Sequence, residues 1–225
     1  MNIKSKIVCI STTAILTLTL TGYSFAAGTF TDLSNVVEKE KIIVLQEKGY
    51  INGIGKGLFS PKSILTAAEG IQLIVNVLDL NIDNVRFIKA PKATDYFPKA
   101  NNEAWYSNAL IIASVKGLNI PPDTDPKKAW TREEFTYYLV TAMETHRNMP
   151  MIKISPANIS DGDKITSSFE GVIQRALVYG IAKLDDKGRF NPKAKMTRAE
   201  AAEQIYNVLE YFKAHPVQVE DKVIE

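Results

Sequence analysis

The tetrapeptide Thr-Arg-Ala-Glu at residues 197–200 decides how this chain is organised, because diverged copies of it occur twice earlier in the sequence. These copies are Thr-Ala-Ala-Glu at residues 66–69 and Thr-Arg-Glu-Glu at residues 131–134. The three threonines lie 65 and 66 residues apart. Such regular self-similarity indicates a chain built from tandem structural repeats.

Each tetrapeptide closes a longer shared segment that opens with an aspartate and passes through a glycine. The aspartate precedes the threonine by 34, 36 and 36 residues in the three copies. The first and third copies also share an aromatic-x-proline step, at residues 59–61 and 190–192. The shared positions are Asp32, Asp95 and Asp161, followed by Gly49, Gly117 and Gly180.

The tetrapeptides also predict where helices begin. Threonine followed three residues later by glutamate is a capping box, in which the threonine oxygen accepts the N3 amide and the glutamate reaches back to the N-cap amide. An apolar face with helical spacing follows each box. Its members are Ile71, Ile74, Val75 and Leu78 in the first copy, Phe135, Leu139, Ala142 and Met143 in the second, and Ala201, Ile205, Val208, Leu209 and Phe212 in the third.

A second amphipathic helix is predicted before the glycine that the three copies share, which is placed to end the helix in a left-handed conformation. The apolar positions are Ile42, Ile43 and Leu45, then Leu110, Ile111 and Ala113, then Val172, Ile173, Ala176 and Leu177. Each unit is therefore helix, loop, helix. Because two helices cannot bury an apolar face alone, we expect the three tandem units to pack into one all-α domain.

The N-terminus has the pattern of a secretory signal peptide over residues 1–27. Lys4 and Lys6 precede an apolar run over residues 7–20, and small residues follow at Ala26 and Ala27. The run is too short for a comfortable membrane span. We therefore expect a secreted protein with no transmembrane segment in the mature chain. The predicted divisions after the signal peptide are repeats at 28–88, 89–153 and 154–213 and a flexible C-terminal tail at 214–225.

Composition excludes several classes of function. Lysine plus arginine number 27 against 25 acidic residues, and removal of the two lysines of the signal peptide leaves 25 against 25. A net charge near zero argues against nucleic-acid binding. The one cysteine, Cys9, lies inside the signal peptide, so we expect neither disulfides nor thiol chemistry in the mature chain. With only His146 and His215 and no cysteine cluster, we expect no metal, no cofactor and no catalytic residues.

The order of these motifs resembles the S-layer homology domain family, and the third copy resembles it most completely through residues 190–192 and 196–200. The resemblance implies a pseudo-threefold bundle of the three capped helices. It also implies grooves between repeats that hold secondary cell-wall polysaccharide, which often carries pyruvate ketals. The expected location is the cell wall or S-layer of a bacterium.

The chain departs from the family pattern at several groove positions. The first repeat has Ala67 in place of arginine and Val37 in place of tryptophan. The second keeps Trp105 but replaces the glycine-rich turn with residues 119–122, and the third has Ser168 near the tryptophan position. These departures imply one or two competent grooves, or none.

Arg132 and Arg198 are the first candidates for glycan binding. A planar guanidinium holds a carboxylate through two parallel hydrogen bonds. Both arginines fall in the first turn of a predicted helix, where we expect free backbone amides and the helix dipole to favour an anion as well. The basic loop of the third repeat is the most promising place for this chemistry, with Lys183, Lys187, Arg189, Lys193 and Lys195.

The remaining candidates each have a structural alternative. Asp32, Asp95 and Asp161 bind sugar hydroxyls or, equally well, stabilise turns before the first helices. Trp105 stacks on a sugar face or packs in the core. The capping glutamates are expected to serve the helices and not catalysis.

The sequence thus predicts a non-catalytic surface module that binds an anionic secondary cell-wall polysaccharide. A second hypothesis is a degenerate scaffold whose repeats bind other surface-layer proteins without a glycan. An enzyme such as a wall hydrolase is the third, and it is disfavoured because the chain has no nucleophile elbow, phosphate loop or zinc motif.

Overall fold

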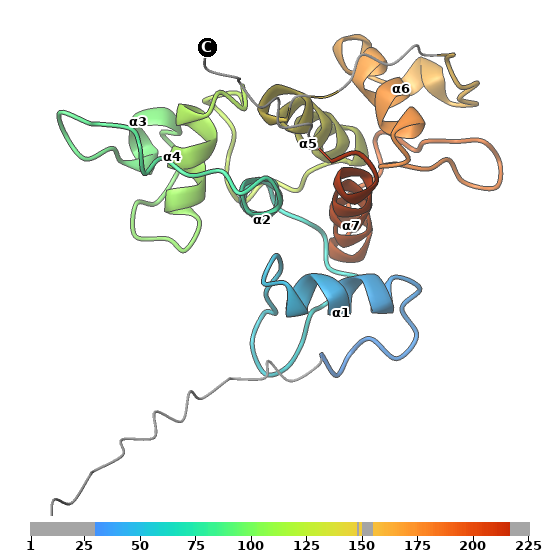
Figure 1. The fold of residues 1–225 in the computed structure, drawn as a ribbon, viewed down its shortest axis with the longest axis horizontal. Helices are drawn as coiled ribbons and strands as arrows, with labels where there is room; N and C mark the ends of the chain where they lie inside the picture. Colours follow the sequence, from blue (N-terminus) through green and yellow to red (C-terminus); the bar gives the residue numbers. More distant parts are fainter. Residues whose placement is uncertain (1–29, 148, 150–154, 217–225) are drawn as a thin grey trace, which may run out of the picture.

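Three capped helices form the centre of the molecule in the computed structural model, which describes residues 30–147, 149 and 155–216. They are α2 (Ala67–Val77), α5 (Arg132–His146) and α7 (Arg198–Ala214). α2 packs against both of the others (Figure 1). The predicted signal peptide and the predicted tail from residue 217 onward lie outside the described residues.

The capping boxes predicted from the sequence are present at all three helix starts. In α2, Thr66 Oγ1 accepts from the Glu69 amide at 3.3 Å, and Glu69 Oε2 accepts from the Thr66 amide at 2.8 Å. The same reciprocal pairs join Thr131 with Glu134 and Thr197 with Glu200. The three predicted helix starts are therefore confirmed.

The remaining helices precede the glycines that the three repeats share. They are α1 (Lys39–Glu47), α4 (Ser107–Val115) and α6 (Glu170–Val178), with a short α3 (Ala93–Tyr96) before α4 and single 3₁₀ turns η1 (Gly162–Lys164) and η2 (Ser167–Phe169) before α6. Gly49, Gly117 and Gly180 follow these helices with φ of +75°, +72° and +70°. They adopt the left-handed conformation that ends a helix, as predicted.

The first helix of each repeat packs against the capped helix of a different repeat. α4 lies against α2, α6 against α5, and α1 against α7 (Figure 1). The chain therefore folds as one interlocked domain and not as three separate helix pairs. The predicted all-α class is confirmed, because the described residues contain isolated bridges but no sheet. The pseudo-threefold symmetry of the bundle stays a prediction.

A closed ring of backbone hydrogen bonds joins the three segments that lead into the capped helices. The Leu65 amide donates to the Met196 carbonyl at 2.8 Å, and the Met196 amide to the Trp130 carbonyl at 3.0 Å. The Trp130 amide completes the ring by donating to Leu65 at 3.0 Å. The three helix starts are thereby fixed relative to one another.

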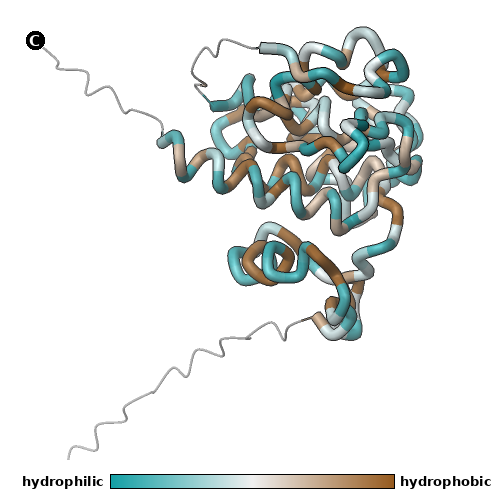
Figure 2. The backbone as a smooth tube through the Cα atoms, turned by 90° about the vertical axis from the view of Figure 1, so that its right-hand side faces the viewer, coloured by the Kyte–Doolittle hydropathy of each residue, from teal (hydrophilic) through white to brown (hydrophobic). Residues whose placement is uncertain are grey.

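The apolar faces predicted for α2 and α5 are completely buried, and that of α7 is buried up to Val208, with Leu209 and Phe212 only partly covered. Hydrophobic and hydrophilic positions alternate along the helices, as Figure 2 shows. Trp130, 1% exposed, packs on α2 where Gly70 has no side chain. None of the helices in the described ranges has the length and apolar content needed to cross a bilayer.

Candidate functional site

The two candidate arginines both pair with the capping glutamate of another repeat. Arg198 Nη1 donates to Glu69 Oε1 at 2.7 Å, and Arg132 Nη1 donates to Glu200 Oε1 at 2.9 Å. Each glutamate therefore caps its own helix with Oε2 and holds a guanidinium with Oε1. At the third junction Ala67 has no guanidinium, and Lys128 fills the place by donating to Glu134 Oε1 at 2.7 Å.

The expectation of free backbone amides beside these arginines is wrong. The Arg198 and Ala199 amides donate to the carbonyls of Ser63 and Pro61 at 2.9 and 3.0 Å. The first two amides of α5 donate in the same way to residues 194 and 192, and the capping threonines take the third amide of each helix. Carbonyls from another repeat occupy these donors, so only the side chains remain to bind an anion.

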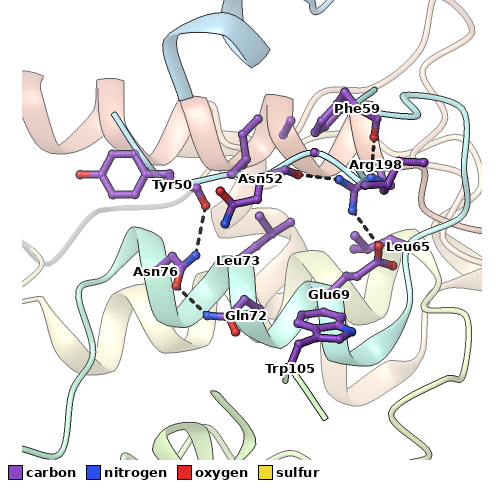
Figure 3. Close-up of a pocket in the computed structure, with 14 residues that line it drawn as sticks. Tyr50, Asn52, Phe59, Leu65, Glu69, Gln72, Leu73, Asn76, Trp105 and Arg198 are labelled. Carbon is purple, nitrogen blue, oxygen red and sulfur yellow. Dashed lines mark hydrogen bonds and ion pairs between the residues drawn. The ribbon is translucent and has the colours of Figure 1, made fainter. Parts of the chain in front are cut away.

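A pocket of about 710 Å³ opens beside Arg198 (Figure 3). Three repeats contribute to its walls: the first through the turn after α1 and one face of α2, the second through Trp105 just before α4, and the third through the start of α7. The lining residues that carry the argument below are Asn52, Ile54, Gln72, Leu73, Trp105 and Arg198. A volume of this size accommodates a small ligand.

Arg198 is fixed in orientation but keeps two donors. Its Nε donates to the Phe59 carbonyl at 3.0 Å and its Nη2 to the Asn52 carbonyl at 3.1 Å, while the guanidinium lies 4.8 Å from the centre of the Phe59 ring. A guanidinium has five N–H groups, and three of them are used by these contacts and by Glu69. One N–H on each terminal nitrogen is left to donate to a ligand.

Trp105 forms an exposed aromatic wall of the pocket. Its side chain is 64% exposed, and it meets Tyr106 edge-on at 5.4 Å. Ile54, 58% exposed, adds apolar surface to the same pocket. Of the two roles left open for Trp105, the structure excludes burial in the core.

Another part of the pocket wall is polar. Gln72 Nε2 donates to Asn76 Oδ1 at 2.7 Å, and Asn76 Nδ2 donates to the Tyr50 carbonyl at 3.2 Å (Figure 3). These bonds hold the two amides in place. The Gln72 carbonyl oxygen is left to accept from a ligand hydroxyl.

Arg132 lies in a different environment and does not line this pocket. Its guanidinium is 5.6 Å from the centre of the Phe190 ring, and its Nε is buried without a hydrogen-bond partner. The structure therefore separates the two arginines that sequence reasoning treated alike.

Asp32 and Asp161 hold the aromatic-x-proline turns. Asp161 Oδ1 and Oδ2 accept from the amides of Phe190 and Asn191 at 2.8 and 3.0 Å. Asp32 binds residues 59 and 60 in the same way. Burial alone would raise the pKa of Asp32, but these amide donors and the charge of Arg198 outweigh it and lower the pKa. Both carboxylates are thus occupied by long-range contacts and not by local turns.

Asp95 has no such role, because the second repeat lacks the aromatic-x-proline step. Its side chain is exposed and accepts from the Lys92 amide at 2.8 Å. It lines a second hollow of about 400 Å³ together with Tyr96 and Asn119. This hollow lies apart from Arg132 and Arg198.

The basic loop of the third repeat is not where the pocket beside Arg198 opens. Arg189 pairs with Asp185 at 2.8 Å, and this partner lowers the pKa of the Asp185 carboxyl. Lys193 pairs with Glu133, and Lys183 lies 3.8 Å from Glu203. Three of the cations that were expected to face a ligand therefore have carboxylate partners within the protein.

Glu133 is the one acidic side chain of α5 that is almost completely buried, at 4% exposure. Its oxygens accept from the Thr166 amide and hydroxyl at 3.0 and 2.9 Å as well as from Lys193. Through these contacts, Glu133 joins the second repeat to the third. Across the described residues, no three histidine, aspartate or glutamate side chains gather in an arrangement that suits a metal ion.

Sequence reasoning missed the turn after α1 and the α2 face that complete the pocket. Gly53, Gly55 and Gly57 mark this turn in the sequence. A Cβ on Gly53 would lie 2.5 Å from the Leu58 carbonyl oxygen, so this tight turn requires glycine. The glycine-rich turn, which the second repeat lacks, was the available signal.

Comparison with known proteins agrees with this architecture. The family model for the S-layer homology domain matches residues 29–69 and 158–202, which fall in the first and third repeats. It does not cover the second repeat, where the turn residues differ.

Three curated proteins are similar to most of this chain. Exoglucanase XynX of Acetivibrio thermocellus and an amylopullulanase of Thermoanaerobacterium thermosulfurigenes are each 28% identical over 184 residues, 81% of this chain. The surface-layer 125 kDa protein of Lysinibacillus sphaericus is 24% identical over 184 residues, 79% of the chain. The aligned region is only 16%, 10% and 14% of those proteins respectively. The similarity therefore concerns one module of much longer proteins.

Proposed function

We propose that this chain is a cell-surface anchoring module that binds an acidic secondary cell-wall polysaccharide in the pocket beside Arg198, a proposal supported by the match of residues 29–69 and 158–202 to the S-layer homology domain. The binding is non-catalytic. The glycan is the attachment point that keeps the protein on the wall or in the S-layer.

The juxtaposition of Arg198 and Trp105 in one pocket is the observation that carries this proposal. An oriented guanidinium with two remaining donors suits a carboxylate, such as that of a pyruvate ketal on a sugar. An exposed indole offers a flat apolar surface for a pyranose ring. Together the two side chains match a ligand that is acidic at one end and sugar-like beside it.

The other walls of the pocket are consistent with the same ligand. Ile54 and Leu73 supply apolar surface that suits the methyl group of a ketal. Gln72 offers an amide oxygen for a sugar hydroxyl, in a position fixed by Asn76. The charge of Glu69 is already compensated by Arg198 and by the Thr66 amide and hydroxyl, so repulsion of an acidic ligand is reduced.

The test is co-sedimentation of the protein with purified wall sacculi, before and after the secondary polysaccharide has been extracted. We expect retention on intact sacculi and loss of retention on extracted ones. Trp105 is 64% exposed, so Trp105→Ala is expected to leave the fold intact and to reduce retention strongly. Asn108→Ala is the exposed control on α4 that does not line the pocket, and it is expected to sediment like the wild type.

Equal retention on extracted and intact sacculi would contradict the proposal. If the protein were instead captured by S-layer protein and not by polysaccharide, the scaffold hypothesis would replace it. A second version of the test uses polysaccharide from which the ketals have been removed by mild acid. Unchanged binding to that polymer would exclude the ketal carboxylate as the group that Arg198 recognises.

A further inference from the structure

We infer that the chain is monovalent: it takes one glycan, in the pocket beside Arg198, because side chains of the protein occupy the two corresponding places on α5 and α7. This inference rests on the proposed function and adds to it the number of working sites and the residues that close the others.

The three places correspond by their distance from the capping threonines. Gln72 and Asn76 follow Thr66 by six and ten residues, and the same steps lead from Thr131 to Tyr137 and from Thr197 to Glu203 and Asn207. The structure supports this correspondence. Asn207 Nδ2 donates to the Ile181 carbonyl just after Gly180, as Asn76 donates to the Tyr50 carbonyl just after Gly49.

Aromatic rings fill the place on α5. Tyr137 stands where α2 has Gln72, and its ring stacks on that of Phe169, with centroids 4.1 Å apart and planes inclined by 21°. Phe169 directly precedes α6, as Tyr106 precedes α4, and Ser168 stands two residues before α6, where Trp105 stands before α4. The exposed indole of the pocket is thus missing here, and the stacked rings of Tyr137 and Phe169 lie at this place instead. Ala67 also provides no guanidinium at this junction.

An ion pair occupies the place on α7. Glu203 stands where α2 has Gln72, and it accepts from Lys41 at 2.6 Å, with Lys183 3.8 Å away. The carboxylate replaces the Gln72 amide at this place, and Lys41, the nearest cation, is already committed to it. Val37, two residues before α1, stands where Trp105 stands before α4, so the stacking surface is missing as well. Arg132 is the arginine at this place, but it has neither the indole nor the glutamine amide that line the pocket with Arg198.

Two measurements on the same sample test the inference, with short fragments of the purified secondary polysaccharide as the probe. The chain has two tryptophans, and Trp130 is buried at 1% exposure, so a fluorescence change on titration reports the pocket of Trp105. Calorimetry reports every site. We expect both to give about one fragment per chain at the same affinity. Arg132→Ala is expected to keep that stoichiometry, whereas Trp105→Ala is expected to weaken binding about 30-fold or more.

A calorimetric stoichiometry near two, or binding heat that persists in Trp105→Ala at near wild-type affinity, would overturn monovalency while leaving glycan binding intact. No heat and no fluorescence change with any fragment would overturn the proposed function, and monovalency with it. Lys41→Met combined with Glu203→Gln provides a positive test, since it removes the charge from the α7 site. We expect the fluorescence titration of this double variant to match that of the wild type and calorimetry to detect a second, weak site. If calorimetry still gave one site, the ion pair would not be what closes the place on α7.

Discussion

Arg198 and Glu69 are 129 residues apart in the chain, yet their side chains form a 2.7 Å ion pair between the first and third repeats. Glu69 also caps α2, so one carboxylate fixes a helix start and orients the guanidinium that faces the pocket. Folding and recognition therefore use the same contact. The pocket exists only when the first and third repeats have been brought together.

Gly70→Ala is expected to destabilise the protein, although alanine is the better helix former. An added Cβ would lie 2.4 Å from two ring atoms of Trp130, which is buried and cannot withdraw. Overpacking of this kind costs about 1–3 kcal/mol. Urea denaturation at neutral pH measures the change in the free energy of unfolding.

Gly171→Ala is the matched control for that substitution. Gly171 also lies within a helix, but the nearest atom to an added Cβ is the end of the flexible Arg175 side chain, at 3.6 Å. We expect stabilisation by up to about 1 kcal/mol, the helix preference of alanine over glycine. Equal effects of the two substitutions would contradict the packing assigned to Trp130.

Asp161→Ala is expected to cost about 1–3 kcal/mol, because it leaves the Phe190 and Asn191 amides without an acceptor in a largely buried turn. Asn191 has φ of +57°, so this turn also depends on the carboxylate to hold an unfavourable backbone conformation. Asp95→Ala, at the corresponding exposed position, is expected to change stability by less than about 0.5 kcal/mol. Thermal unfolding by circular dichroism compares them, and a loss of similar size in both variants would contradict the assigned role.

Asp32 is expected to make stability depend on pH in the acid range. Its pKa is lower in the folded protein than its ordinary value of 3.8, so its contribution is complete above that value and is lost as pH falls through the lower folded pKa. Asp32→Asn should be less stable than the wild type at neutral pH and should lose less stability between about pH 5 and about pH 3. Urea denaturation across this range gives both slopes, and parallel slopes would refute the assignment.

Local features of the fold could be predicted from the sequence. The capping boxes at Thr66, Thr131 and Thr197 and the left-handed glycines that end the first helices depend only on neighbouring residues. The apolar faces of α2 and α5 follow from helical spacing. Such spacing shows which face is buried but not which helix covers it. That α4 covers α2 and α1 covers α7 was therefore beyond local reasoning.

The candidate site was predictable to a smaller extent. Arg198 and Trp105 were found, but Gln72 and Asn76 were not, because nothing in a local pattern distinguishes a polar pocket wall from a solvated helix face. The first amides of α7 were expected to be free because no local pattern reveals their acceptors. These acceptors are the carbonyls of Pro61 and Ser63, which belong to another repeat. The basic loop looked unpaired for the same reason: Glu133 and Glu203 are distant in sequence from the lysines that they hold.

The most direct test of the central claim is the affinity of purified secondary polysaccharide fragments for Arg198→Ala and Arg132→Ala, measured by calorimetry on samples shown to be folded. The arginines have equivalent positions and equivalent glutamate partners, but only Arg198 lines the pocket with Trp105. We predict a loss of about 30-fold or more for Arg198→Ala and less than about 3-fold for Arg132→Ala. Equal losses, or a larger loss for Arg132→Ala, would contradict the assignment of the site.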